Sequence, residues 1–319
     1  MAAVVWGVVA AGSLTAGCTA GGAPDDDGRA SEPKPTPSPT RGAERAASVL
    51  AVKIDNAPRA RPHTGLGAAD IVYVEQVEGG LSRLLAVYAS ALPKAVGPVR
   101  SARETDLELL RQFDHPTLAF SGAQTKLLPL IDGAPLRAEP PGRTPGAYYR
   151  DSAKAAPHNL YLRPHHLAPS APGKAALTTG FTYGEAPDGG RTETTRTVRY
   201  PAARFTFTWD ESRDRYRVAM DGTAAVTTDG QPVAPATVVV QYVRMRQSDY
   251  FDSRGSNTPY TETTGSGTAQ VLRDGRTYEA LWKRPEPGDG TRFTTVDGEP
   301  VNFAGGQVWV VLARAASRG

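Results

Sequence analysis

The chain has 319 residues, of which 39% are hydrophobic and 22% charged. This length and composition suit a globular protein of about two domains and exclude a wholly disordered chain. The formal net charge is only +3, with no dense run of Lys and Arg, so we expect no nucleic acid partner. A single cysteine, Cys18, excludes an intrachain disulfide and a cysteine-based metal site.

The first 18 residues have the pattern of a lipoprotein signal peptide. Residues 2–14 are apolar or small and carry no charge. They are too few to span a bilayer, which needs ~20 apolar residues, but they suit a secretory signal. The small residues before Cys18 resemble a lipobox, in which the cysteine becomes the acylated N-terminus and carries chains such as palmitate. Two departures are the absence of Lys or Arg before the apolar run and Thr15 where Leu is commoner. A short buried helix with an ordinary core cysteine is the alternative.

Residues 19–47 have the composition of a tether. An acidic run at 25–27 precedes alternating prolines at 33–39. Such a segment cannot bury a core and favours extended, solvated backbone. We therefore expect a disordered tether behind Cys18. The whole N-terminal pattern predicts a protein that is extracytoplasmic and lipid-anchored to the cell membrane.

Residues 48–180 predict a mixed-sheet α/β domain. Apolar runs at 49–54 and 117–120 indicate strands. Residues 70–77 and 81–91 lie on either side of a glycine pair and predict a hairpin. Strands that interleave with helices favour a sheet with helical cover.

Two helices are expected in this first part. Ser101 and Glu104 match a capping box, and the apolar spacing that follows predicts a helix over residues 102–113. A second helix over residues 124–131 would turn three apolar side chains inward, namely Leu127, Leu128 and Ile131. The remainder, to about residue 180, is rich in Pro and Gly and should be mostly irregular.

Residues 181–319 predict an all-β domain, either a small barrel or a sandwich. Alternating runs at 205–209 and 216–220 indicate one hairpin, and Asp274 and Gly275 suit the type I′ turn of another. Further strands are expected at 237–245, 268–272, 277–282, 291–296, 301–303 and 307–312. The fold class of the whole chain is therefore α+β.

Several strings in this order resemble the YerB-like lipoprotein family, over residues 49–319. The most specific are Gly-Pro-Val-Arg-Ser-Ala-Arg at 97–103 and Pro-His-Asn-Leu-Tyr at 157–161. Others are Ile-Asp-Asn at 54–56, Arg-Pro-His-Thr-Gly-Leu at 61–66, Gly-Ser-Gly at 265–267 and Gly-Gln-Val-Trp at 306–309. His63 stands where Gln is frequent, and Val74 where an acid is expected. The resemblance implies a two-part fold, export and anchoring, and it names no reaction.

The start of the predicted helix is the most informative place for a ligand. A helix N-terminus offers free N–H groups and partial positive charge. Arg100 and Arg103 beside it would cost about 0.3–1 kcal/mol each, which suggests an anionic partner. A salt-bridge network to Glu75, Glu78 or Asp70 explains the same pattern. The expected ligand-binding cleft comprises Arg61, Glu75, Glu78, Arg83, Arg100, Ser101, Arg103, His158 and Asn159.

Catalytic and metal sites have weaker support. Glu75 and Glu78 could form the carboxylate pair of a glycosidase, although their spacing near a strand end would turn them in different directions. His158 and the adjacent pair His165 and His166 have no acid close by, and adjacent histidines point apart. We find no Gly-x-Ser-x-Gly motif and no phosphate-binding glycine loop. We therefore expect no metal and no cofactor, and we assign no catalytic residue.

The preferred function is a non-enzymatic binding protein of the cell envelope. It would reach the membrane through its lipid anchor and hold an anionic ligand in the Arg/Glu-lined cleft. One alternative is an envelope hydrolase or modifying enzyme that uses the same acidic residues and His158. Another is a scaffold that recruits an envelope protein through its β half.

Overall fold

The computed structural model describes residues 48–251 and 255–316. These belong to one compact unit, Ala46–Gly319. The predicted signal peptide, the lipidation site Cys18 and the tether up to residue 47 lie outside the described residues.

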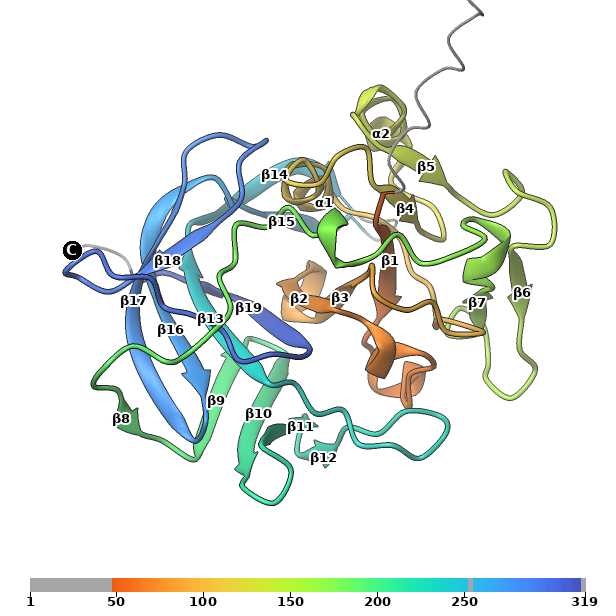
Figure 1. Cartoon of the computed structure of the whole chain (residues 1–319). Coiled ribbons are helices and arrows are strands. Elements are labelled where there is room, and N and C mark those ends of the chain that lie inside the picture. The colour runs from red at the N-terminus through yellow and green to blue at the C-terminus, as the bar shows by residue number, and fades with distance from the viewer. Residues whose placement is uncertain (1–47, 252–254, 317–319) are drawn as a thin grey trace, which may run out of the picture. The chain divides into compact units, whose positions relative to one another are not determined.

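An 11-stranded mixed sheet forms the centre of this unit (Figure 1). Its strands run in the order β18-β17-β16-β13-β19-β2-β3-β1-β4-β5, and β8 pairs with β17. The bounds in chain order are β1 (Leu50–Asp55), β2 (Ile71–Gln76), β3 (Ser82–Tyr88), β4 (Thr117–Ala119), β5 (Arg137–Glu139), β8 (Arg191–Thr192), β13 (Thr237–Val243), β16 (Gly265–Arg273), β17 (Arg276–Arg284), β18 (Arg292–Thr294) and β19 (Val308–Arg314).

The last strand, β19, joins the two sequence halves within this sheet. It pairs in parallel with β13 on one side and with β2 on the other. The sheet therefore runs continuously from the N-terminal half to the C-terminal half. The boundary near residue 180 stays a prediction.

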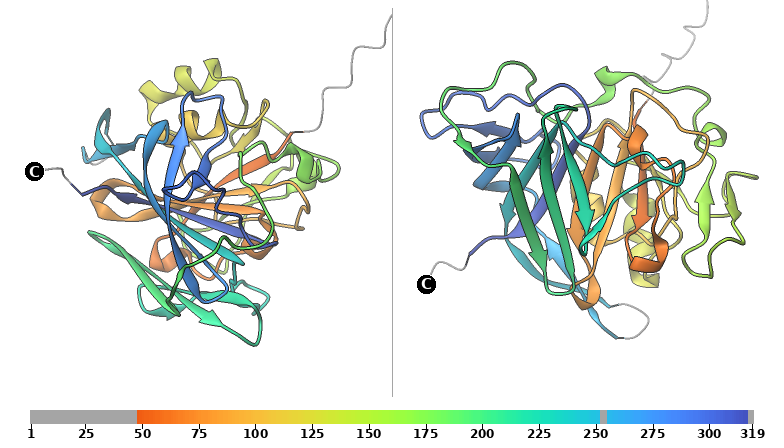
Figure 2. Two further views of the ribbon diagram at one scale, coloured as in Figure 1. Left: turned by 60° about the vertical axis from the view of Figure 1, so that its left-hand side comes forward. Right: turned by 90° about the horizontal axis from the view of Figure 1, so that it is seen from below.

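A second sheet covers one face of the large one (Figure 2). It has the order β12-β11-β10-β9, with β9 (Thr195–Tyr200), β10 (Ala203–Asp210), β11 (Arg215–Met220) and β12 (Thr223–Ala224). Phe205 and Phe207 of β10 pack against Trp309 of β19, with ring centroids 6.3 and 5.9 Å apart. Burial of each such side chain contributes roughly 1.5–3 kcal/mol. The large sheet is open from β18 to β5, so the described residues form no closed barrel.

Helices α1 (Glu104–Leu110) and α2 (Leu128–Gly133) cover the opposite face. Leu109, Leu110 and Ile131 are buried there, among side chains of β1, β2 and β3. Two small hairpins belong to neither of these sheets. One consists of β6 (Tyr148–Arg150) and β7 (Leu160–Leu162), and the other of β14 (Met245–Phe251) and β15 (Asn257–Thr261). Single 3-10 turns are η1 (Pro58–Ala60), η2 (Leu66–Ala68), η3 (Glu78–Gly80), η4 (Thr125–Leu127), η5 (Pro164–His166) and η6 (Lys174–Ala176).

The predicted hairpins are confirmed. β2 pairs with β3, β10 with β11, and β16 with β17, each antiparallel. Asp274 and Gly275 both have positive φ, 54° and 69°, as a type I′ turn requires.

The predicted helix start is wrong. α1 begins at Glu104, and its N-cap is Arg103 rather than Ser101. Residues 100–102 instead make irregular backbone pairs with β1 and with residues 121–122: Arg100 N–H donates to the Lys53 carbonyl and Ala102 N–H to the Gly122 carbonyl. Asp106, not Glu104, accepts the Arg103 N–H, at 2.6 Å.

Two smaller predictions also fail. Residues 301–303 form no strand; Val301 N–H donates to the Phe293 carbonyl, and Phe303 makes an isolated bridge with Tyr183. The Leu128 side chain, expected inward, is 38% exposed, because the helix begins one turn late after η4.

Candidate functional site

Charged side chains lie near the adjoining ends of three neighbouring strands, on the helix-covered face. Asp55 of β1, Arg83 of β3 and Glu75 of β2 stand opposite one another in register. Lys53 precedes Asp55 by two positions and shares its face, because side chains alternate along a strand. These charged residues lie on the same face of the sheet as the apolar side chains that pack against α1. Their side chains are therefore buried along with that apolar cluster.

Lys53 forms the centre of a buried triad. Its Nζ donates to Glu75 Oε2 at 2.8 Å and to Asp106 Oδ1 at 2.6 Å, and the lysine is fully buried. An ammonium taken out of water is tolerated only when it is paired and hydrogen-bonded. The triad thereby ties α1 to the ends of β1 and β2.

Two carboxylates share this single ammonium. Burial, together with the nearby Asp106 carboxylate, outweighs the attraction of Lys53 and raises the pKa of Glu75 to about 7. Its second oxygen, Oε1, has no hydrogen-bond partner among the described residues. Glu75 therefore takes up a proton near neutral pH.

Glu78 forms a second buried group with two arginines. Arg103 Nε donates to Glu78 Oε1 at 2.5 Å, and Thr258 Oγ1 of β15 donates to the same oxygen. Arg83 Nη2 lies 3.8 Å from Oε2, while its Nη1 donates to the Ser101 carbonyl. Burial opposes ionisation of Glu78, but these donors prevail and lower its pKa to about 2. The sequence suggested that Arg103 pairs with an acidic residue of the preceding hairpin instead of a ligand. The ion pair between Arg103 and Glu78 confirms this alternative.

Asp55 organises a third group, which reaches the surface. Its Oδ2 accepts from His158 Nδ1 at 2.8 Å and lies 3.4 Å from Arg100 Nε. The side chains of Arg100 and His158 are 29% and 18% exposed, against 5% for Asp55. A buried carboxylate thus holds the partly exposed side chains of Arg100 and His158 in fixed positions.

Arg61 lies in the adjoining loop. Its Nε donates to Asn56 Oδ1, and its Nη1 contacts Asp221 Oδ2 at 2.8 Å. Asn56 in turn donates to Ser82 Oγ. The Ser101 hydroxyl lies 3.5 Å from Ser121 Oγ, and Asn159 Oδ1 accepts a hydrogen bond from Arg150 Nη1.

The nine residues expected in one cleft therefore divide into a buried and a half-exposed set. Glu75, Glu78, Arg83 and Arg103 are at most 9% exposed and bind one another, Lys53 or Thr258. Arg61, Arg100, Ser101, His158 and Asn159 retain exposure. Contact of either set with a ligand stays a prediction.

Sequence reasoning missed several residues of these groups. Lys53 could have been recognised from the sequence, because a lysine inside an otherwise apolar strand needs a buried acidic partner. Asp55 and Asp106 carry no pattern of their own, and their partners lie far away in sequence. His165 and His166 make no common site with His158, and no group of three or more His, Cys, Asp or Glu in the described residues could hold a metal. Nor does this part of the chain contain a helix long and apolar enough to cross a membrane.

Family models match both halves of the chain. Residues 35–177 match the protein of unknown function (DUF3048) N-terminal domain, and residues 196–310 match its C-terminal domain. A protein named "Putative lipoprotein YerB", from Bacillus subtilis strain 168, is 26% identical over 277 residues, which is 82% of this chain and 80% of that protein.

The crystal structure of the YerB protein from Bacillus subtilis has the same fold. It superposes with a TM-score of 0.68 at 23% identity, over 84% of this chain and 91% of the solved chain. Fold and family models together define a two-part protein class of unknown function. The chain belongs to the YerB-like family, which confirms the resemblance seen in its sequence motifs.

Proposed function

We propose that the chain is an extracytoplasmic lipoprotein that binds an anionic ligand of the cell envelope through the surface around Arg100 and His158. The apolar start, Cys18 and the Pro-rich segment support export and anchoring. The name of the Bacillus subtilis relative supports the same conclusion.

The tethered arginine carries the ligand part of the proposal. Arg100 directs Nε toward Asp55 Oδ2 at 3.4 Å, and among the described residues its two Nη groups donate no hydrogen bond. Those two groups form a fork that matches the oxygens of a carboxylate or phosphate. His158, held through Nδ1 by the same Asp55, places a second polar side chain beside it.

Neighbouring charges favour an anion as well. Arg61 and Lys154 join Arg100 and His158 around the end of β1, where Lys154 Nζ donates to the Ala60 and Pro62 carbonyls at 2.5 and 2.6 Å. Burial lowers the pKa of Lys154, although Asp151 and Asp55 oppose this. Arg61, Arg100 and Lys154 outnumber Asp55 and Asp221, the two acids that pair directly with these basic side chains.

The buried residues have a positioning role in this proposal. Arg83 fixes the carbonyl of Ser101, next to Arg100, and Lys53 fixes the strand that carries Asp55. Glu75, Glu78 and Arg103 complete that support without reaching the surface. Because both glutamates are buried, no observation favours the hydrolase alternative.

Anchoring is tested by Cys18→Ser in the full chain, with Ser38→Ala as the matched control. We expect the control protein in the membrane fraction and the cysteine variant in the soluble extracytoplasmic fraction. Equal membrane association of the two would overturn the anchoring proposal.

Ligand binding is tested by co-sedimentation with purified cell-wall sacculi, with and without their anionic polymers. Arg100→Gln should weaken binding at least tenfold, because one hydrogen bond to a charged group is worth ~1.5–3 kcal/mol and tenfold corresponds to ~1.4 kcal/mol. Arg59→Gln, an equal charge change on an exposed neighbour, should bind as the wild type does. Binding that ignores both Arg100 and the anionic polymers contradicts the proposal.

A further inference from the structure

The second sheet turns one face to the large sheet and the other to solvent (Figure 2). Its inward positions are apolar, and Phe205 and Phe207 pack there against Trp309. Because side chains alternate along a strand, the intervening positions of β9, β10 and β11 point outward. These outward positions carry basic side chains and hydroxyls, namely Thr195, Thr197, Arg199, Arg204, Thr206, Thr208 and Arg217.

Two arginines stand opposite each other on this outer face. Arg199 of β9 and Arg204 of β10 are register partners, and directly opposed like charges destabilise a sheet. Within the part of the chain that the structure describes, neither guanidinium donates a hydrogen bond or pairs with an acid. Asp221, the acid at the end of the same row, already pairs with Arg61 at 2.8 Å. An anion bound by both arginines would relieve their repulsion.

This arginine pair adjoins the surface around Arg100. Asp221 accepts the Arg204 N–H through Oδ1 at 2.7 Å and Arg61 Nη1 through Oδ2 at 2.8 Å. The loop that carries Arg61 begins directly after Asp55, whose carboxylate lies 3.4 Å from Arg100 Nε. A line of basic side chains therefore leads from the end of β1 onto the second sheet. The members of this basic track are Arg100, Arg61, Arg204 and Arg199.

Hydroxyls continue the outer face beyond the arginine pair. Two cross-strand pairs of threonines follow it, Thr197 with Thr206 and Thr195 with Thr208. Arg217 stands opposite Thr208, and this row lies about 13 Å along the strands from that of Arg204, at ~3.3 Å per residue. The Arg217 side chain is 60% exposed and 3.4 Å from Asp210. Basic side chains separated by hydroxyls suit a polymer in which anionic groups alternate with polar, uncharged links.

The same face lacks the rings that hold nucleic acids. No outward position of β9, β10 or β11 is aromatic, and Trp209 lies on the inward side, with its ring 5.0 Å from that of Tyr216. Proteins that bind single-stranded nucleic acid stack its bases on aromatic side chains. Guanidinium groups, by contrast, match the oxygens of a phosphate. The outer face therefore favours a phosphate polymer without bases.

We propose that the anionic ligand is a linear polymer of phosphodiester-linked polyol units, which runs from Arg100 along the basic track onto the outer face of β9, β10 and β11. Arg199 and Arg204 pair with its phosphates, and the threonine hydroxyls bind the polyol links. This inference rests on the proposed function, because it names the ligand class of the surface around Arg100 and extends that surface. A long polymer gains contacts that a short fragment at Arg100 lacks.

The test measures binding of a two-unit glycerol phosphate oligomer and of a long poly(glycerol phosphate) to the full chain with Cys18→Ser. Arg199→Gln combined with Arg204→Gln should weaken binding of the polymer at least tenfold and leave that of the short oligomer unchanged. The salt dependence of polymer binding, as the slope of log K against log salt, should become shallower by about 0.7–1.4, for one or two phosphates released.

The matched control removes another cross-strand pair of cations. Lys283 and Arg292 are exposed register partners at the β18 edge of the large sheet, away from the basic track. Lys283→Gln combined with Arg292→Gln should change the binding of neither ligand. Both double variants should unfold at or slightly above the wild-type temperature, because each removes opposed like charges from the surface.

Failure of this inference differs from failure of the proposed function. Loss of binding that is equal for the two ligands, or absent for both, in the variant of Arg199 and Arg204 overturns the inference. Tighter binding of a single-stranded oligonucleotide or of a uronic acid polymer with the same number of charges does so too. If Arg100→Gln weakens both ligands while the paired variant weakens neither, the proposed function stands and the inference fails. If Arg100→Gln weakens neither, the proposed function itself fails.

Discussion

Lys53 places its Nζ 2.6 Å from Oδ1 of Asp106, and both side chains are fully buried. This contact joins the first strand of the large sheet to the helix that covers it. Glu75 completes the triad at 2.8 Å, which leaves two carboxylates for one ammonium. The excess negative charge is relieved when Glu75 takes up a proton, as its raised pKa indicates.

Replacement of the shared lysine should be strongly destabilising. Lys53→Met leaves Glu75 and Asp106 buried beside each other without a cation, so we expect a loss of about 3–5 kcal/mol in the free energy of unfolding. Urea denaturation measures the change. Lys126→Met, on an exposed lysine, should alter stability by under about 0.5 kcal/mol. A small effect of Lys53→Met would show that the triad contributes little.

Glu75 should make the protein less stable as pH rises toward neutrality. Its folded pKa, about 7, lies above its ordinary value of 4.5, so the folded state keeps a proton that the unfolded state releases. Between pH 4.5 and 7 the wild type should therefore lose stability relative to Glu75→Gln, by roughly 3 kcal/mol in total. Urea midpoints at four pH values within this window measure the difference. Parallel pH profiles of the two proteins contradict the prediction.

His63 should make the protein less stable as pH falls, which is the opposite pH dependence to that of Glu75. Burial lowers its pKa to about 4, and the attraction of the Asp55 backbone only partly offsets this. As pH falls below 6.5, the unfolded state takes up a proton that the folded state refuses, so stability falls.

The test of His63 is His63→Gln, which retains an N–H donor for the Asp55 carbonyl now 2.9 Å from Nε2. We expect near-wild-type stability at pH 8 and greater stability than the wild type at pH 4.5 in thermal unfolding. His165→Gln, on an exposed histidine, serves as the control. An acid sensitivity equal to that of the wild type would exclude this role for His63.

Gly267 should tolerate no side chain. Gly267→Ala puts a methyl group 2.6 Å from Trp282 Nε1, so the indole must move and its hydrogen bond to Tyr242 is lost. We expect a loss of ~1–3 kcal/mol and a change in tryptophan fluorescence. Gly133→Ala, where a Cβ meets nothing within 4 Å, is the matched control and should be neutral or slightly stabilising. Unchanged fluorescence in Gly267→Ala would refute this packing.

Local patterns allowed the hairpins to be predicted. β2 with β3 and β16 with β17 are contiguous in sequence, and their turns carry glycines at positions that require positive φ, Gly79 and Gly275. The information for such elements lies within about twenty residues, which is why periodicity and turn chemistry suffice.

Contacts between residues far apart in sequence could not be predicted from such local patterns. Ser101 and Glu104 match a capping box, yet residues 100–102 pair with β1 and with the Ser121–Gly122 turn, and that tertiary pairing overrides the local signal. Asp106 and Glu75 meet Lys53 only because β1, β2 and α1 come together in the fold.

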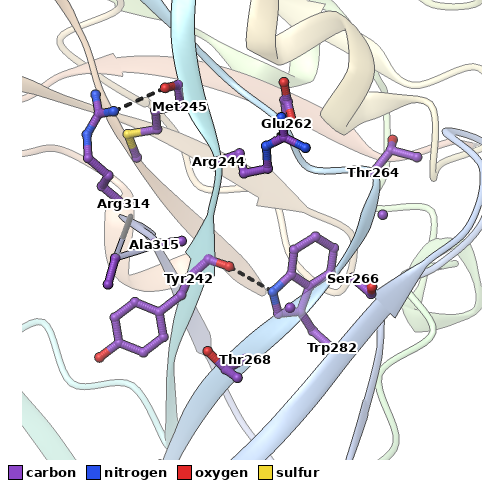
Figure 3. A pocket seen from close by; sticks show the side chains of 13 residues that line it. Tyr242, Arg244, Met245, Glu262, Thr264, Ser266, Thr268, Trp282, Arg314 and Ala315 are labelled. Carbon is purple, nitrogen blue, oxygen red and sulfur yellow. Dashed lines mark hydrogen bonds and ion pairs between the residues drawn. The ribbon is translucent and has the colours of Figure 1, made fainter. Parts of the chain in front are cut away.

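The candidate site was predicted in part. The pairing of Arg103 with Glu78 was foreseen as an alternative, whereas Asp55, which binds both Arg100 and His158, was not. Beside Gly267, Trp282 Nε1 donates to the carbonyl of Tyr242, 40 positions away in sequence (Figure 3), and a Gly-Ser-Gly string carries no sign of this contact.

The placement of β19 has a consequence for biogenesis. A protein exported N-terminus first would deliver β1, β2 and β3 to the far side of the membrane long before residues 308–314 arrive. Yet β2 has no partner on its β13 side until β19 enters between them. The open edge of β2 would stay vulnerable to aggregation or proteolysis during the whole of translocation. Folding would therefore finish only when the last strand had crossed, and a chain that stalled before it would leave a substrate for quality-control proteases.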